Sequence, residues 1–172
     1  MSKLDILLVP HPALKTKAKP VPAVDDRVRK LMDDMLETMY DAPGIGLAAP
    51  QVGVLDRVLV IDVANKDEEP QPLRMANPEI LWASDDLGTY NEGCLSLPEQ
   101  YADVTRPAEV KIRYLDENNA SQTLHARDVL ATCVQHEIDH LDGILFTDHL
   151  SPLKRNMILR KLAKWRKTQA AA

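Results

Sequence analysis

Several features are scarce in this chain of 172 residues, and each scarcity excludes a class of protein. Aromatic residues make up only 4% of it, so the core is expected to consist mainly of aliphatic side chains and methionine. No stretch is long enough to span a membrane, and the apolar run after Lys3 is interrupted by Asp5 and ended by Pro10, which is unlike a signal peptide. We therefore expect a cytoplasmic protein. In a reducing compartment, Cys94 and Cys133 are more often free or metal-bound than joined in a disulfide.

Acidic residues are absent after Asp148, although the whole chain carries a formal net charge of -5. The negative total gives no general case for a nucleic-acid-binding protein, and no DNA partner is expected. The end of the chain is nevertheless basic, and Ser151 followed by Pro152 predicts the start of a helix over residues 152–168. Seven cations belong to this basic C-terminal helix: Lys154, Arg155, Arg160, Lys161, Lys164, Arg166 and Lys167.

The chain has no internal repeat and no linker, so residues 1–172 are predicted to form a single domain. Apolar residues at helical spacing predict one helix from Asp25 to Tyr40 and another from Asp128 to Leu141, with Asp128 as its N-cap. Between them, residues 57–63 and the alternating apolar residues of 110–114 predict strands. Strands in the middle and helices at both ends indicate an α+β fold.

The segment His136-Glu137-Ile138-Asp139-His140 is the most informative in the chain. Residues four apart lie on one face of a helix, so His136 and His140 can bind the same metal ion. Glu137 then lies where it can contact a metal-bound water, whose pKa falls to roughly 7, and can carry its proton. The alternative is two surface histidines on an amphipathic helix, which is disfavoured because the apolar residues of this segment indicate partial burial.

Two imidazoles do not complete a catalytic site, which usually has three protein ligands. Common metallopeptidases take the third ligand from further along the chain, but no glutamate follows Glu137, and Phe146 stands where one peptidase class has histidine. A zinc peptidase is therefore the weaker enzymatic alternative. Three other residues after the pentapeptide can bind metal but have no familiar spacing: Asp142, Asp148 and His149.

The two cysteines differ in how well they can supply the third ligand. Cys133 lies seven residues before His140, a rise of roughly 10 Å along a helix, whereas a metal–sulfur bond is only about 2.3 Å long. Cys133 is therefore expected to be a buried thiol of the helix. Cys94, which we expect in a loop, is the better ligand.

Three segments together resemble the signature of the peptide deformylase family: Gly44 to Gln51, Glu92 to Ser96, and Gln135 to Leu141. The His-Glu-x-x-His pattern alone is shared by many hydrolases, but the three motifs in this order are highly specific. The similarity extends from His11-Pro12 to Ser151-Pro152-Leu153. It implies a single α+β domain in which a metal-bearing central helix packs against small antiparallel or mixed β-sheets, with further helices at both ends.

The resemblance also implies a reaction and the residues that perform it. Members remove the formyl group from the N-terminal formyl-methionine of nascent proteins. By resemblance, Cys94, His136 and His140 hold one divalent metal, usually Fe²⁺, which Zn²⁺, Ni²⁺ or Co²⁺ can replace. Glu137 is the implied general base and then the acid.

The same resemblance makes the side chain of Gln51 and the backbone N–H of Leu95 donors to the oxyanion. A neutral amide suits that task, because it meets developing negative charge without adding a charge of its own. Without its motif, Gln51 reads as a polar turn residue after Pro50. The resemblance further implies a substrate-binding pocket for the methionine side chain, formed by Ile45, Gly46, Glu92, Gly93, Val129, Thr132 and Cys133.

Residues in and just after two of the motifs lead to further predictions about substrate binding. Glycine allows a close approach, so the segment 44–46 can pair with an extended peptide like an added strand, although simple turn chemistry explains Gly44 equally well. Many family members have arginine a few residues after the cysteine motif, where this chain has Tyr101, so contacts beyond the methionine are expected to differ. Arg106 is expected to form a structural ion pair with Asp139.

The cations of the basic C-terminal helix raise the question of a binding partner. Its residues Leu153, Met157, Leu162 and Trp165 suggest an apolar stripe surrounded by cations, and such charge runs are most often simply solvated. The substrate, however, emerges from the phosphate-rich ribosome, so we hypothesise that the helix docks on ribosomal RNA. A catalytically silent, metal-binding or ribosome-associated homologue is the remaining alternative, which the presence of both a base and an oxyanion donor disfavours. A monomer is favoured.

Overall fold

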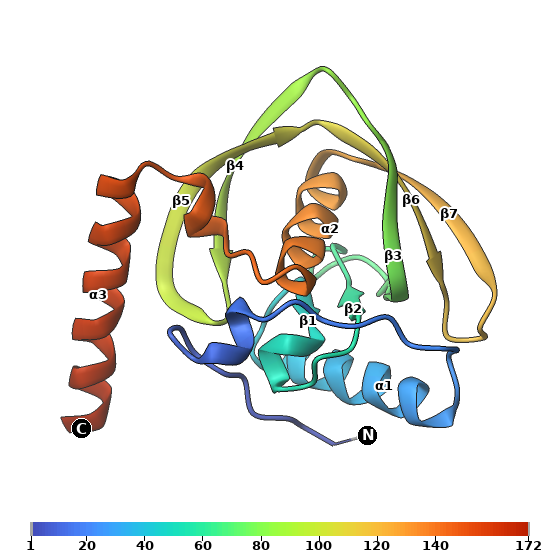
Figure 1. Cartoon of the computed structure of the whole chain (residues 1–172), viewed down its shortest axis with the longest axis horizontal. Coiled ribbons are helices and arrows are strands. Elements are labelled where there is room, and N and C mark those ends of the chain that lie inside the picture. Colours follow the sequence, from blue (N-terminus) through green and yellow to red (C-terminus); the bar gives the residue numbers. More distant parts are fainter. Residues whose placement is uncertain (1, 172) are drawn as a thin grey trace.

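The computed structural model describes residues 2–171, which form two antiparallel sheets with one helix between them and two helices on the outside (Figure 1). The α+β prediction is confirmed. Within this range no helix combines the length and the apolar character needed to cross a bilayer. The helices are α1 (Asp26–Asp41), α2 (Asp128–Leu141) and α3 (Pro152–Ala171), with short 3-10 turns η1 (Pro12–Lys15), η2 (Ala49–Val52) and η3 (Phe146–His149). The strands are β1 (Gly46–Ala48), β2 (Val58–Ile61), β3 (Leu73–Ala83), β4 (Leu87–Cys94), β5 (Leu97–Pro107), β6 (Glu109–Leu115) and β7 (Ser121–Arg127).

Helix α1 forms where its apolar spacing predicts it. The carboxylate of Asp25 accepts a hydrogen bond from the backbone N–H of Val28 at 3.0 Å, which caps the first turn. On the inner face Met32, Met35 and Met39 are fully buried. They pack in one apolar cluster with Val58 and Val60 of β2 and their neighbours, so α1 covers one face of the larger sheet.

The larger sheet has the strand order β1-β2-β3-β6-β7, with every neighbouring pair antiparallel. Side chains alternate across a strand, and all four residues of β2 are buried, so β2 must be covered on both faces. Leu59 and Ile61 belong to the apolar cluster of α2, whereas the other two residues of the strand face α1. The sheet therefore separates α1 from α2.

Helix α2 lies in the middle of the molecule, between the larger sheet and the β4–β5 hairpin (Figure 1). Its bounds agree with the sequence prediction, and the left-handed Gly143 follows just after its end, with φ 75°. The predicted cap is wrong by one position: Asp128 is the first helical residue, and Arg127 occupies the N-cap, where its side chain makes no capping hydrogen bond. Because sheets surround it, nine of its 14 residues are buried, among them polar ones.

The β4–β5 hairpin carries the cysteine motif. Cys94 is the last residue of β4, paired with Leu97 across a two-residue turn, and so does not lie in an open loop as expected. The register shifts between Gly93 and Cys94, where β5 has three extra residues, 98–100. This irregularity turns the end of β4 toward the central helix.

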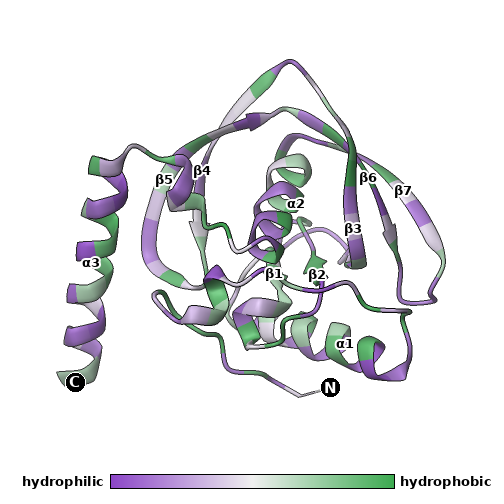
Figure 2. Cartoon of the chain, viewed as in Figure 1, coloured by the Kyte–Doolittle hydropathy of each residue, from purple (hydrophilic) through white to green (hydrophobic). Residues whose placement is uncertain are grey.

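Helix α3 packs beside β5 and runs three residues further than predicted (Figure 1). The predicted apolar stripe is only partly correct. Leu162 is buried, but Leu153 and Met157 are 68% and 45% exposed. Ile158 is the other buried residue of the helix. Figure 2 accordingly shows hydrophobic residues on more than one side of α3.

Candidate metal centre and substrate cavity

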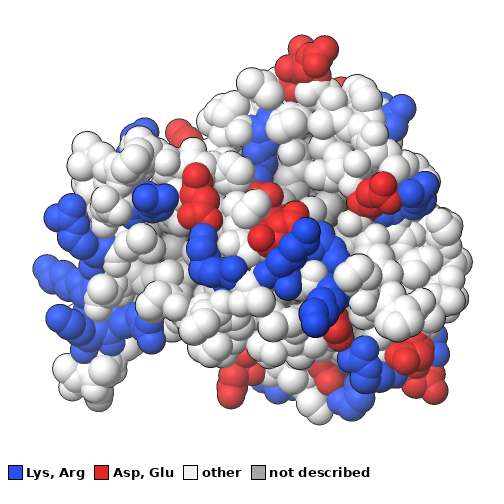
Figure 3. All heavy atoms as spheres, viewed as in Figure 1, with Lys and Arg blue, Asp and Glu red and all other residues white. Residues whose placement is uncertain are grey.

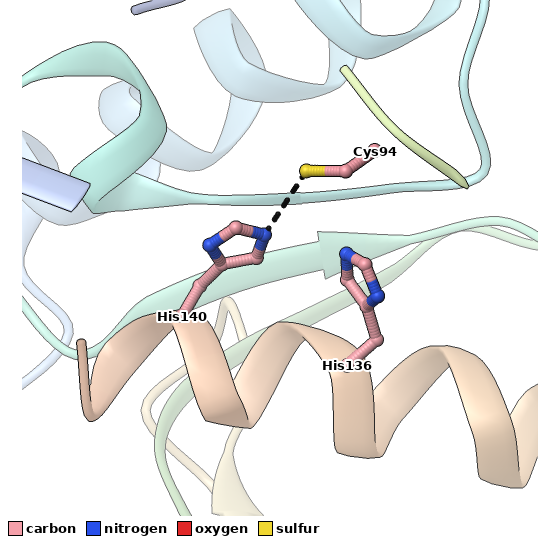
Figure 4. A group of neighbouring side chains, drawn as sticks. All are labelled: Cys94, His136 and His140. Carbon is pink, nitrogen blue, oxygen red and sulfur yellow. Dashed lines mark hydrogen bonds between the residues drawn. The ribbon is translucent and has the colours of Figure 1, made fainter. Parts of the chain in front are cut away.

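Three side chains that can bind metal converge between α2 and the end of β4 (Figure 4). Cys94, His136 and His140 each offer one ligand atom, and these atoms all lie within 4.8 Å of one another. The Sγ atom of Cys94 is 3.3 Å from Nε2 of His140. Since a metal ion bonded to two ligands at about 2.0–2.3 Å holds them at such separations, a thiolate and two imidazoles here fit a tetrahedral divalent metal. It is the one group of this kind among residues 2–171.

A buried ion pair orients one of the two imidazoles. Nδ1 of His136 lies 2.9 Å from Oε1 of Glu92, and Arg106 contacts both oxygens of that carboxylate, at 2.7 and 2.9 Å. Burial acts to raise the pKa of Glu92, but the bonds from Arg106 and His136 outweigh it and lower the pKa. Because the carboxylate is ionised it must accept, so Nδ1 of His136 donates and Nε2 is left to face the metal position.

The other imidazole is enclosed more tightly. His140 is 1% exposed, and its Nδ1 has no hydrogen-bond partner. Burial lowers the pKa of His140 well below its ordinary value, and the positive charges of His136 and Arg106 act in the same direction. The ring is therefore held in the neutral form that binds a metal.

The carboxylate of Glu137 lies beside this cluster and is itself buried. Its Oε1 atom has no hydrogen-bond partner. A Cβ atom at Gly46 would lie 2.5 Å from Oε2 of Glu137, so a larger residue at this position of β1 would displace the carboxylate from its present place. Burial raises the pKa of Glu137 to about 7, and the neighbouring carboxylates of Glu92 and Asp139 add to that effect. A carboxyl group with such a pKa can both accept and release a proton near neutral pH.

The amide of Gln51 has a fixed orientation. Its Oε1 accepts a hydrogen bond from the backbone N–H of Ala48 at 2.9 Å, which directs the NH₂ group the other way. That group donates to Oγ of Ser96 at 3.1 Å and lies 3.5 Å from Sγ of Cys94. Gln51 is therefore a buried donor beside the cluster rather than an exposed turn residue. Leu95, in the turn after Cys94, lines the same space.

A cavity of about 900 Å³ opens onto the cluster. Its wall includes Gln51, Cys94, His136 and Glu137. Burial raises the pKa of the Cys133 thiol well above its ordinary value, so the thiol stays protonated and donates to the carbonyl of Ile45 at 3.7 Å. All seven residues expected in the methionine pocket lie on the cavity wall: Ile45, Gly46, Glu92, Gly93, Val129, Thr132 and Cys133.

One side of the cavity is an edge of the larger sheet. Strand β1 pairs with β2 alone, from Gly46 to Ala48, and is therefore the edge strand. Gly44 to Gly46 line the cavity next to it. The β4–β5 hairpin forms the opposite side. There the ring of Tyr101 from β5 lies over Gly93 of β4, so closely that a Cβ atom added at Gly93 would clash with it. An elongated ligand thus has an open strand edge on one side and the β4–β5 hairpin on the other.

The alternative ligands considered from sequence lie elsewhere. Asp142 pairs with Arg57 at 3.0 Å, and Asp148 pairs with Lys15 at 2.6 Å. His149 bonds to Asp139 at 2.7 Å rather than joining the cluster. The predicted ion pair of Arg106 with Asp139 is confirmed at 2.8 Å.

Two supporting contacts had no signal in the sequence. The carboxylate of Glu92 was expected only as pocket wall, but it also orients His136. The ring of Phe146 stacks on His136, with centroids 6.1 Å apart and an interplanar angle of 24°. Both contacts join residues from different elements, so no local spacing could have indicated them.

Comparison with known proteins gives one consistent result. A family model described as polypeptide deformylase matches residues 3–156. A peptide deformylase of Phenylobacterium zucineum is 58% identical over 164 residues, which cover 95% of this chain and 97% of that protein. A crystal structure of a peptide deformylase from Ehrlichia chaffeensis has a TM-score of 0.94 at 39% identity, covering 98% of this chain and 99% of the other. A second structure from that organism, in complex with actinonin, has a TM-score of 0.91 at 41% identity, covering 95% and 98%.

Proposed function

The chain belongs to the peptide deformylase family, and on that premise we propose the role of each residue in removing the formyl group from new proteins. The overall reaction is hydrolysis of the formamide at N-terminal formyl-methionine, which releases formate and a free amino group. We treat residues 1–172 as one functional domain, acting in the cytoplasm. The assignment of roles rests above all on one observation: Cys94, His136 and His140 converge beside Glu137.

Cys94, His136 and His140 are the residues that would hold the divalent metal. One sulfur and two imidazole nitrogen ligands suit a borderline-soft cation, and we propose Fe²⁺, with Zn²⁺, Ni²⁺ or Co²⁺ able to take its place. When bound, such a metal acts as a Lewis acid and lowers the pKa of water. The chain's own contribution is to fix the ligands. Glu92 holds His136 through Nδ1, and burial keeps the ring of His140 neutral.

Glu137 moves the proton. As water attacks the formyl carbon, Oε1, which has no other partner, accepts a proton from the water. When the carbon–nitrogen bond breaks, the carboxylic acid gives this proton to the departing nitrogen, so the products are formate and the amine. The carboxyl group suits both steps because burial brings its pKa to about 7.

Gln51 and Leu95 donate hydrogen bonds to the formyl oxygen and so stabilise the negative charge that develops on it. The NH₂ group of Gln51 is already aimed by the bond from Ala48, so no reorganisation is needed during the reaction. The backbone N–H of Leu95 is the second proposed donor. The methionine side chain occupies the cavity, and the peptide that follows it extends along the open edge of β1.

Replacing Gln51 tests the oxyanion role. We expect Gln51→Glu to lower kcat by about 100- to 1,000-fold, because the glutamate is isosteric and can still accept from Ala48 but donates nothing to the oxyanion. Steady-state release of formate measures kcat, and metal analysis controls for loss of the ion. A variant with normal metal content and normal kcat would show that Gln51 is not a donor.

One assay separates the proposed reaction from the two other functions considered. The Ni²⁺-loaded protein is incubated with formyl-Met-Ala-Ser, and the products are identified. Formate with an intact tripeptide supports deformylation. Cleavage of a peptide bond would instead indicate a peptidase, and the absence of product would indicate a silent homologue.

We also propose that α3 docks on the ribosome. Cations gather over α3 in Figure 3, and Lys161, Lys164 and Lys167 are exposed. The helix itself is anchored to the body, since Arg166 donates to the carbonyl of Val9 at 2.7 Å and Leu162 is buried. Its free cations are therefore presented on a fixed support, where they can meet RNA phosphates.

Changing these three lysines tests the docking. We expect glutamine at positions 161, 164 and 167 to weaken co-sedimentation with ribosomes and to reduce the slope of log affinity against log salt by about 2. The control changes three exposed lysines outside α3, Lys17, Lys19 and Lys66, to glutamine, which removes the same charge. Equal losses in both triple variants would mean that net charge, not α3, determines binding.

A further inference from the structure

The short turn η3 is connected to the metal ligand His136 in two ways, one direct and one through other residues. At its start, the ring of Phe146 stacks on the imidazole of His136. At its end, Nε2 of His149 lies 2.7 Å from Oδ2 of Asp139 on α2. Phe146 is 1% exposed and part of the apolar core, so its contact is explained by packing. The contact of His149 is polar and lies near the surface, so packing does not explain it.

From His149 a continuous row of hydrogen bonds leads inward. The same Oδ2 atom of Asp139 accepts from Nη1 of Arg106 at 2.8 Å. Arg106 then donates through Nε and Nη2 to the two oxygens of Glu92, at 2.7 and 2.9 Å. Glu92 accepts from Nδ1 of His136 at 2.9 Å. Four consecutive contacts therefore join His149 to a metal ligand.

Exposure rises along this row toward the outside. The side chains of Arg106 and Glu92 are 5% and 4% exposed, Asp139 is 20% exposed and His149 is 37% exposed. Asp139 is thus the point at which water can compete with the guanidinium for the carboxylate. A donor on the outer side of Asp139 restrains its side chain and preserves the bond to the buried Arg106.

We propose that His149 is a positioning residue for the metal centre. By holding Asp139 against Arg106, it keeps Arg106 in its two-point contact with Glu92, and Glu92 in turn keeps Nε2 of His136 directed at Cys94. The proposal rests on the metal role given to His136 above. It assigns a function to a histidine that belongs neither to the cavity wall nor to the ligand cluster.

The chain contains a matched histidine that lacks this connection. Nε2 of His125 lies 2.8 Å from Oε1 of Glu109, and its side chain is 34% exposed, close to the value for His149. Glu109 is bonded to Arg127 rather than to Arg106. An equivalent surface pair thus exists without a path to His136, and the two histidines can be compared directly.

The test measures Co²⁺ affinity of the metal-free protein by competition with a chelator. We expect His149→Ala to weaken Co²⁺ binding by about 3- to 10-fold, less than the 10- to 100-fold typical of residues bonded directly to a ligand. We expect His149→Gln, which retains an N–H donor, to restore most of the affinity. His125→Ala should bind Co²⁺ like the wild type.

Three results would overturn the proposal: unchanged affinity in His149→Ala, an equal loss in His125→Ala, or no recovery in His149→Gln. Thermal unfolding of the metal-free variants separates positioning from general stability, since His149→Ala and His125→Ala should unfold at similar temperatures. A lower unfolding temperature in His149→Ala alone, without recovery of affinity by glutamine, would indicate a merely structural pair. The metal site is tested apart from this: if Cys94→Ala kept full Co²⁺ affinity, the proposed ligand set itself would fail.

Discussion

Replacing Glu137 with glutamine is expected to lower kcat by about 100- to 10,000-fold while the metal remains bound, because an amide cannot take up and return the proton. The carboxylate has no other structural duty that glutamine would disturb. Its Oε1 has no partner, and the space beside Gly46 accepts an amide of the same shape. Glu137→Ala should lose turnover as well, again with the metal retained.

Three measurements decide the result for Glu137. Formate release gives kcat, metal analysis gives occupancy, and KM shows whether substrate binding has changed. A loss of kcat at unchanged metal content and similar KM is the signature of an interaction made in the transition state. Near-normal turnover in Glu137→Ala would mean that another group is the base.

Replacing Cys94 with alanine is expected to weaken metal binding by more than about 100-fold. Loss of a residue that only hydrogen-bonds to a ligand typically weakens binding by 10- to 100-fold, and loss of a ligand itself should cost more. Formate release should fall with the metal. The loss follows from geometry, because Cys94 supplies the one ligand that does not come from α2. Two imidazoles on one helix cannot enclose a cation without a third ligand from the opposite side.

Cys133→Ala provides the matched control for Cys94→Ala. Both residues are free thiols close to the cavity, but Cys133 donates to the carbonyl of Ile45 and is not part of the ligand cluster. We expect this variant to keep its metal. Undiminished metal content and formate release in Cys94→Ala would refute the proposed centre, and metal loss in both variants would point to a general effect of removing a thiol from this region.

The amino-acid sequence by itself determined the elements whose signal is local. Helical spacing located α1 and α2 to within a residue at each end, because the side chains that share a helix face are only three or four positions apart. The same rule placed His136 and His140 on one face. The three motifs indicated the family, and the rise of a helix was enough to favour Cys94 over Cys133 as the third ligand.

Only the tertiary structure decided the features that depend on contacts between residues far apart in the sequence. Strands β3, β4 and β5 have no clear alternation of their own, and their registers follow from partners up to several tens of residues away. The buried face of α3 was predicted only in part: Leu162 and Trp165 pack against the body as expected, but Ile158 is buried whereas Leu153 and Met157 are exposed. The row from His149 to His136 joins η3, α2 and two strands, so it exists only once these elements are packed together. A sequence records spacing along the chain, whereas hydrogen bonds and metal ligands depend on distances through space.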